Sequence, residues 1–188
     1  MPISTPHQEI TYIPLQHFID STMLYRVTST NVNGTKNQSP YLLTTGRFGL
    51  SIEKEEEFAH RTQLIAKHLE KYRKGGKTLV IGTGEFMYVP MQLASHMGSD
   101  VYFQATTRSP IYQTNQESYT IQNKFIFDSP ENGGLINHLY NIQPYQYEEI
   151  FIFIERMSST TGTDMLLKEL QRTKIPFITI VMMTESIA

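Results

Sequence analysis

Two short apolar segments, residues 78–81 and 101–105, constrain the fold of this chain more than any other feature. Each has the length and composition of a buried strand. The first runs into the glycine-containing turn 82–84, and a helical pattern follows over residues 90–97 until Gly98 ends it. A strand, a helix and a second strand in this order predict a βαβ unit with parallel strands and a right-handed crossover.

The same alternation recurs toward the C-terminus. Residues 150–154 form a continuous apolar run, which is typical of a strand covered on both faces, and residues 177–182 form the last buried strand. Between them, residues 160–172 have a helical pattern. We expect residues 121–127 to form a strand nearer a sheet edge and residues 136–140 to form a short helix or helical turn. The sequence therefore predicts a Rossmann-like, three-layer α/β domain with a mostly parallel sheet of about five strands.

The N-terminal part is less regular, and we expect one domain over residues 1–188 in which residues 1–40 form an irregular lead-in. Residues 10–13 and 23–27 are candidates for short strands there, and the lead-in is a candidate linker from an upstream domain. The first clear helix is expected over residues 51–73, with acidic residues in its first turns and basic residues at its end, as the helix dipole favours. Its apolar stripe consists of Phe58, Thr62, Ile65, Leu69 and Tyr72.

The composition argues against several classes of function. The hydrophobic fraction is 39% and the net charge is -2, so the chain is globular and lacks the basic excess of a general nucleic-acid-binding protein. It contains no cysteine, which excludes disulfides and thiolate catalysis, and His60 and His68 lack a zinc-binding pattern. No apolar run is long enough to span a bilayer and no secretion signal is visible. We therefore expect a cytoplasmic protein with no membrane partner and no metal site.

Polar residues follow the two strands of the predicted βαβ unit at the points where the strands end. In an open α/β sheet, ligands bind at the carboxyl ends of the strands, and backbone N–H groups at a helix start favour anions. Hydroxyl groups and an arginine fork also bind phosphate or carboxylate oxygens. We therefore predict an anion site that Arg47 closes; the alternative is that the arginines make ordinary surface contacts. The candidate ligand-binding residues are Arg47, Gly82, Thr83, Gly84, Thr106, Thr107, Arg108 and Ser109.

Glu85 follows the glycine turn at the expected start of the helix. A carboxylate at this position either stabilises the helix dipole or contacts the ligand. In the second case it accepts hydrogen bonds from ribose hydroxyls or acts as a general base, which makes Glu85 the candidate catalytic residue.

Three familiar nucleotide-binding patterns fit this chain poorly. Met87 stands where the dinucleotide fingerprint has its third glycine, and Gln104 and Thr106 occupy the region of the ribose-binding acid. A methyltransferase reading shares this second defect but stays open as an alternative. Residues 76–78 imitate the end of a P-loop, yet they precede a strand where a P-loop follows one. The sequence does not identify a cofactor.

A second loop, residues 154–164, repeats the arrangement of a buried strand, hydroxyl residues with a glycine, and a helix. This arrangement suits a phosphate site built from backbone N–H groups and hydroxyls, although Thr161 and Asp164 would also serve as helix caps. It resembles the phosphoribosyl-pyrophosphate loop of type I phosphoribosyltransferases, but Glu155-Arg156 replaces the acid pair. The candidate second phosphate loop is Ser159, Thr160, Thr161, Gly162 and Thr163.

Residues 46–50, 80–88 and 105–111 together resemble the TRSP domain family, which is named after its Thr-Arg-Ser-Pro motif. Such domains usually lie C-terminal to a phosphoribosyltransferase-like domain in bacterial gene clusters linked to tellurite resistance and stress. The resemblance implies that the domain binds, and potentially acts on, a phosphorylated ribosyl or nucleotide-like metabolite together with a phosphoribosyltransferase. The alternatives are a non-catalytic module that docks on the transferase and an S-adenosylmethionine-dependent methyltransferase-like enzyme.

Overall fold

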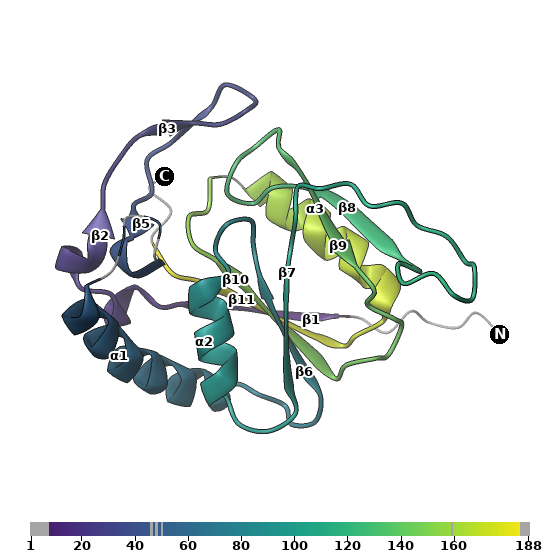
Figure 1. Cartoon of the computed structure of the whole chain (residues 1–188), viewed down its shortest axis with the longest axis horizontal. Helices are drawn as coiled ribbons and strands as arrows, with labels where there is room; N and C mark the ends of the chain where they lie inside the picture. Colours follow the sequence, from purple (N-terminus) through teal and green to yellow (C-terminus); the bar gives the residue numbers. More distant parts are fainter. Residues whose placement is uncertain (1–7, 46, 48, 50, 159, 185–188) are drawn as a thin grey trace.

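The computed structural model describes residues 8–45, 47, 49, 51–158 and 160–184, and its centre is a parallel sheet of five strands (Figure 1). The carboxyl ends of all five strands therefore lie at the same edge of the sheet. The strands are β1 (Glu9–Pro14), β6 (Thr78–Gly82), β7 (Val101–Ala105), β10 (Glu149–Ile154) and β11 (Phe177–Met182), in the spatial order β1-β11-β10-β6-β7.

Both faces of the sheet are covered, which confirms the predicted three-layer α/β architecture. Helices α1 (Ile52–Glu70) and α2 (Tyr88–His96) cover one face, and α3 (Thr160–Leu170) covers the other together with the hairpin of β8 (Lys124–Asp128) and β9 (Ile136–Tyr140) (Figure 1). The apolar run of β10 divides between the two sides: its phenylalanines pack against α1 and α2, and its isoleucines pack against α3 and the hairpin. A strand between two hydrophobic layers needs apolar residues at every position, which explains the continuous run.

The prediction for residues 136–140 is wrong, because they form β9 and not a helical turn. The reason is tertiary: β9 pairs antiparallel with β8, and Leu139 of β9 lies opposite Phe125. Both side chains are buried in the cluster that includes α3. The predicted strand 121–127 exists as β8, but it starts at Lys124 and belongs to this hairpin instead of the central sheet.

The irregular N-terminal segment is confirmed, with one exception. The candidate strand at residues 10–13 is confirmed as β1, but it lies parallel to β11 as an edge strand of the central sheet. Residues 9–14 are therefore part of the core structure and not of a linker. After β1, short strands and 3-10 turns cover the carboxyl edge of the sheet (Figure 1). These elements are η1 (Gln16–Phe18), η2 (Ser21–Met23), β2 (Leu24–Tyr25), β3 (Ser29–Thr30), β4 (Lys36–Asn37), β5 (Tyr41–Leu42) and η3 (Leu43–Thr45).

Helix α1 follows the sequence pattern closely. The Ser51 side chain caps its first turn by accepting a hydrogen bond from the Lys54 N–H, at 3.4 Å. Most of the predicted stripe is buried, but Tyr72 lies beyond the end of the helix and is 41% exposed. In the part of the chain that the structure describes, no helix is long and apolar enough to cross a membrane.

The connections of the sheet diverge between β6 and β10. The chain leaves β6 through α2 to reach β7 on one side, and it leaves β10 through α3 to reach β11 on the other. Because α2 and α3 cover opposite faces, the crevice between the carboxyl ends of β6 and β10 is a topological switch point. Ligands of open α/β sheets bind at such points.

Candidate functional site

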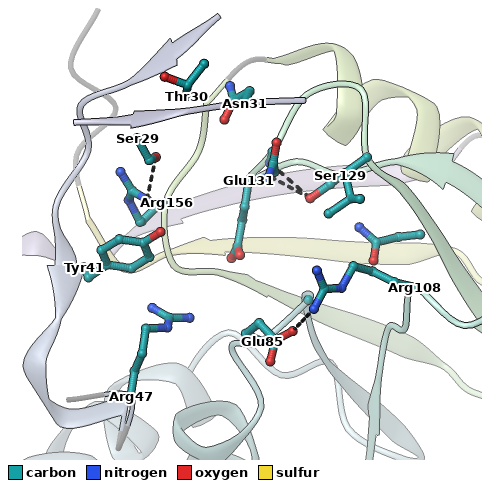
Figure 2. Close-up of a pocket in the computed structure, with 14 residues that line it drawn as sticks. Ser29, Thr30, Asn31, Tyr41, Arg47, Glu85, Arg108, Ser129, Glu131 and Arg156 are labelled. Carbon is teal, nitrogen blue, oxygen red and sulfur yellow. Dashed lines mark hydrogen bonds and ion pairs between the residues drawn. The ribbon is translucent and has the colours of Figure 1, made fainter. Parts of the chain in front are cut away.

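A cavity of about 190 Å³ lies at this switch point. Its walls come from five parts of the chain: the N-terminal segment, the glycine turn after β6, the segment after β7, the β8–β9 hairpin with its loop, and the segment after β10. Figure 2 shows its charged side chains, which approach one another from opposite walls. We call it the switch-point cavity. Its charged lining residues are Arg47, Glu85, Arg108, Glu131 and Arg156.

Glu131, in the loop between β8 and β9, holds the centre of this cavity (Figure 2). Its Oε1 accepts a hydrogen bond from the Glu155 N–H at 2.9 Å and lies 2.9 Å from the Thr83 hydroxyl. Its carboxylate therefore bridges the ends of β6 and β10. Deep burial, followed by the neighbouring Glu155 carboxylate, raises the pKa of Glu131 to about 7. The group is thus able to hold or release a proton near neutral pH.

Glu155 directly follows β10, and its side chain is fully buried. Its Oε1 accepts the Leu42 N–H at 2.8 Å, and its Oε2 forms an ion pair with Arg47 at 2.9 Å. Burial raises the pKa of the Glu155 carboxyl, and the Arg47 guanidinium opposes this rise. The pair ties the predicted site arginine to the base of the cavity.

Arg156 fixes the roof of the cavity. It is 3% exposed, and its guanidinium lies 3.7 Å from the centre of the Tyr41 ring, while Arg47 lies 4.4 Å from the same centre. Among the described residues, its guanidinium donates hydrogen bonds to oxygens of residues 27–39, so it holds the N-terminal segment against the end of β10. The acceptors are Ser39 O at 2.5 Å, Ser29 Oγ at 3.1 Å, Asn37 O at 3.2 Å and Val27 O at 3.4 Å.

The two glycines of the turn after β6 have different roles: Gly82 allows close packing, and Gly84 lines the cavity. A Cβ on Gly82 would lie 2.5 Å from the Phe86 carbonyl oxygen, so this glycine allows the turn to close on itself. Gly84 has φ +56° and lines the cavity, and its N–H donates to the Thr106 hydroxyl at 2.8 Å. Thr83 and Thr106 are both buried. The structure therefore brings the ends of β6 and β7 together, with the hydroxyls turned toward the protein.

The Thr-Arg-Ser-Pro motif continues from β7 along the outer wall. The Thr107 hydroxyl accepts the Ser109 N–H at 3.1 Å, and the Thr107 backbone pairs with that of His138. Arg108 forms an exposed ion pair with Glu85, with 2.6 Å between Nη2 and Oε1. The motif and the glycine turn line a second cavity of about 360 Å³, which we call the motif cavity.

The candidate second phosphate loop packs against residues 129–130 of the β8–β9 loop. The Ser158 N–H donates to the Pro130 carbonyl oxygen at 3.0 Å, immediately before α3. Gly162 and Thr163 are buried, whereas Thr160 and Thr161 are exposed in the first turn of α3. Ser159 lies outside the described residues. The close packing of residues 129–130 therefore gives Gly162 a structural role.

We expect Gly162→Ala to lower the free energy of unfolding by about 2–3 kcal/mol. The new Cβ would lie 2.5 Å from Ser129 O and 2.7 Å from Pro130 N, and these backbone atoms have little freedom to move. Thermal unfolding followed by circular dichroism measures the change. Thr161→Ala, at an exposed position of the same turn, should change the stability by less than about 0.5 kcal/mol. Equal stability of the two variants would contradict the assigned packing.

Sequence reasoning missed the residues of the β8–β9 loop and the N-terminal roof. Glu131, Ser129 and Asn137 line the cavity, as do Ser29 and Tyr41. The available signal was the polar segment that follows the apolar residues of β8. The strand-end rule does not cover it, because β8 belongs to an antiparallel hairpin outside the central sheet. Its position in space depended on the hairpin, which the sequence pattern did not predict.

The fold is that of the phosphoribosyltransferases. Adenine phosphoribosyltransferase from Saccharomyces cerevisiae, complexed with D-2,5-dideoxy-2,5-imino-altritol 1,6-bisphosphate and adenine, matches with a TM-score of 0.50 and 12% identity, over 89% of this chain and 87% of that chain. Hypoxanthine phosphoribosyltransferase from Staphylococcus aureus matches with a TM-score of 0.44 and 13% identity, over 68% of this chain and 62% of that one, which is less than two thirds of its length. The likeness to the yeast enzyme shows an α/β fold of the phosphoribosyltransferase type.

The sequence shows the family to which the chain belongs. A family profile described as "TRSP domain C terminus to PRTase_2" matches residues 44–170. The chain therefore belongs to the TRSP domain family, which confirms the resemblance carried by the glycine turn and by Thr107, Arg108, Ser109 and Pro110. A comparison with curated proteins gave no match.

Proposed function

We propose that this domain binds a phosphorylated ribosyl or nucleotide-like metabolite in the switch-point cavity and works with a phosphoribosyltransferase. The observation that carries the proposal is the charge arrangement of the cavity. The Glu131 carboxylate lies at its centre, and three arginines, Arg47, Arg108 and Arg156, lie around it (Figure 2). A sugar phosphate has complementary chemistry, because its hydroxyls donate to carboxylates and its phosphate accepts from guanidinium groups.

The base of the cavity provides acceptors for hydroxyl groups. Glu131 uses Oε1 for contacts within the protein, and its Oε2 lies on the side of Gly84, 3.6 Å from the position of a Cβ there. Asn137 also lines the cavity and is 1% exposed, and its Oδ1 has no hydrogen-bond partner among the described residues. A buried acceptor without a donor is costly, so a ligand hydroxyl at this position would gain a strong contact.

Arg108 is the arginine best able to bind the phosphate. Arg47 is engaged by buried Glu155, and Arg156 is engaged by the oxygens of the roof. Arg108 is 59% exposed in its side chain, and its only ion-pair partner among the described residues is the equally exposed Glu85. A ligand phosphate can take the place of that carboxylate at small cost, because exposed ion pairs contribute little to stability.

The comparisons support the class of ligand and partner. The yeast enzyme of the same fold was solved with an iminosugar bisphosphate and adenine, and the family is described as a domain C-terminal to a phosphoribosyltransferase. A cytoplasmic setting in a bacterial stress or tellurite-resistance pathway belongs to the same proposal. Glu85 is assigned to controlling Arg108, in place of the direct catalytic role predicted from the sequence.

We expect Arg108→Ala to weaken the binding of ribose 5-phosphate and nucleoside 5′-monophosphates by about 10- to 100-fold, the effect of losing one charge-assisted contact. Isothermal titration calorimetry measures the dissociation constants. Arg172→Ala is the matched control, since Arg172 is another exposed, ion-paired arginine away from the cavity, and its variant should bind normally.

An unchanged dissociation constant in Arg108→Ala would place the anion elsewhere. Absence of binding in the wild type would instead favour the docking-module alternative, which requires no ligand. Binding of S-adenosylmethionine alone would favour the methyltransferase alternative.

A further inference from the structure

The switch-point cavity and the motif cavity share three lining residues, Gly84, Glu85 and Arg108. The first has a volume of about 190 Å³ and the second of about 360 Å³. Small-molecule sites usually measure about 300–1,000 Å³, so the switch-point cavity alone is small for a nucleotide. If the two cavities were joined, their combined volume would lie near the middle of this range.

The only ion pair that the described residues place along this shared wall is Glu85–Arg108, which we call the dividing pair. Its two side chains are 62% and 59% exposed. An exposed pair of this kind contributes little to stability, so it opens easily. The Arg47–Glu155 pair of the same cavity contrasts with it, because the carboxylate of that pair is fully buried.

We propose that the dividing pair is a gate that a ligand phosphate opens. Arg108 exchanges the Glu85 carboxylate for the phosphate, and the two cavities then form one site for a nucleoside monophosphate. The ribose hydroxyls face Glu131 and Asn137 in the switch-point cavity. The base lies in the motif cavity, where Met87 and Ala105 offer apolar surface. This inference rests on the proposed function and narrows its ligand to a nucleotide.

The first test is Glu85→Gln, which removes the carboxylate that competes with the phosphate. We expect the affinity for nucleoside 5′-monophosphates to rise by about 2- to 5-fold, which corresponds to an exposed pair of about 0.4–1 kcal/mol. If Glu85 contacted the ribose hydroxyls as the sequence suggested, the same substitution would lower this affinity and overturn the gate. An unchanged affinity would also overturn it.

The second test uses the absence of cysteine from the chain, because a single introduced thiol is then the only one. Thr30→Cys places it in the switch-point cavity and Met87→Cys places it in the motif cavity, both at exposed side chains. Ser95→Cys on α2 is an exposed control away from both cavities. Alkylation rates are measured with and without saturating ligand.

We expect nucleoside 5′-monophosphates to slow alkylation of both cavity thiols at least several-fold, and ribose 5-phosphate to slow it only in Thr30→Cys. Protection of one thiol alone by the nucleotide would overturn the joined site while leaving the proposed function intact. Binding of neither compound, by calorimetry and by alkylation, would overturn both proposals. Equal protection of Ser95→Cys would mean a global change in structure and would also count against the gate.

Discussion

Arg156→Met is expected to lower the free energy of unfolding by about 3–5 kcal/mol, the largest stability effect that we expect from a single side chain. Methionine fills a similar volume but donates no hydrogen bond, so it leaves three backbone carbonyls and one hydroxyl without their donor. It also removes the cation that stacks on Tyr41. For a chain of this length, the change corresponds to a fall in melting temperature of about 6–20 °C.

Thermal and urea unfolding measure this loss, and limited proteolysis locates it. Because the lost contacts hold residues 27–39, cleavage should become faster in that segment first. Arg172→Met is the matched control, since Arg172 is 55% exposed in its side chain and pairs with Glu169 on the surface. We expect it to cost less than about 1 kcal/mol. Similar losses in the two variants would show that Arg156 is not the residue that holds the roof.

The role of Arg156 also explains how this loop departs from the phosphoribosyl-pyrophosphate loop that it resembles. An arginine stands in the position of the second acid, and it points into the N-terminal segment (Figure 2). The remaining acid, Glu155, is held by Arg47 and by the Leu42 N–H. Under the proposed function, the carboxylate that contacts the ligand is instead Glu131 of the β8–β9 loop, which lines the cavity.

Local sequence patterns predicted a helix or strand wherever its burial alone sets the spacing of its apolar residues. The continuous apolar run of β10 and the stripe of α1 are examples, because burial on two faces or on one face dictates their composition. Residues 136–140 are the counterexample. Their sequence, Ile-Asn-His-Leu-Tyr, has no clear period, and only pairing with β8 makes them a strand. Pairing partners that are not set by a tight turn are invisible to local patterns.

The candidate site was partly predictable for the same reason. The strand-end rule brought together the ends of β6, β7 and β10, because parallel strands share one carboxyl edge. It did not reveal that Gly82 and Gly162 serve close packing, since a glycine needed for packing and one needed for a ligand look alike in sequence. Nor did it find Glu131, whose place depends on the hairpin and on the roof.

Glu131 is expected to make the stability of the folded protein depend on pH. In the folded protein its pKa is raised to about 7, chiefly by burial and then by the Glu155 carboxylate, from an ordinary value of 4.5. Between these two values the folded state holds a proton that the unfolded state has released. Stability therefore falls as the pH rises through this window, because the folded protein must either keep an unfavourable proton or bury a second charge beside Glu155.

From pH 5 to pH 8, we expect the wild type to lose about 2–3 kcal/mol of unfolding free energy through this group, and Glu131→Gln to lose much less. Glutamine keeps an oxygen that accepts from the Glu155 N–H and the Thr83 hydroxyl, so the variant should fold normally while its charge no longer titrates. Urea unfolding at a series of pH values measures the difference. Glu56→Gln, at an exposed position on α1, is the control and should keep the slope of the wild type. Parallel pH profiles for the wild type and Glu131→Gln would mean that Glu131 is ionised throughout this range, and that the cavity holds a permanent negative charge.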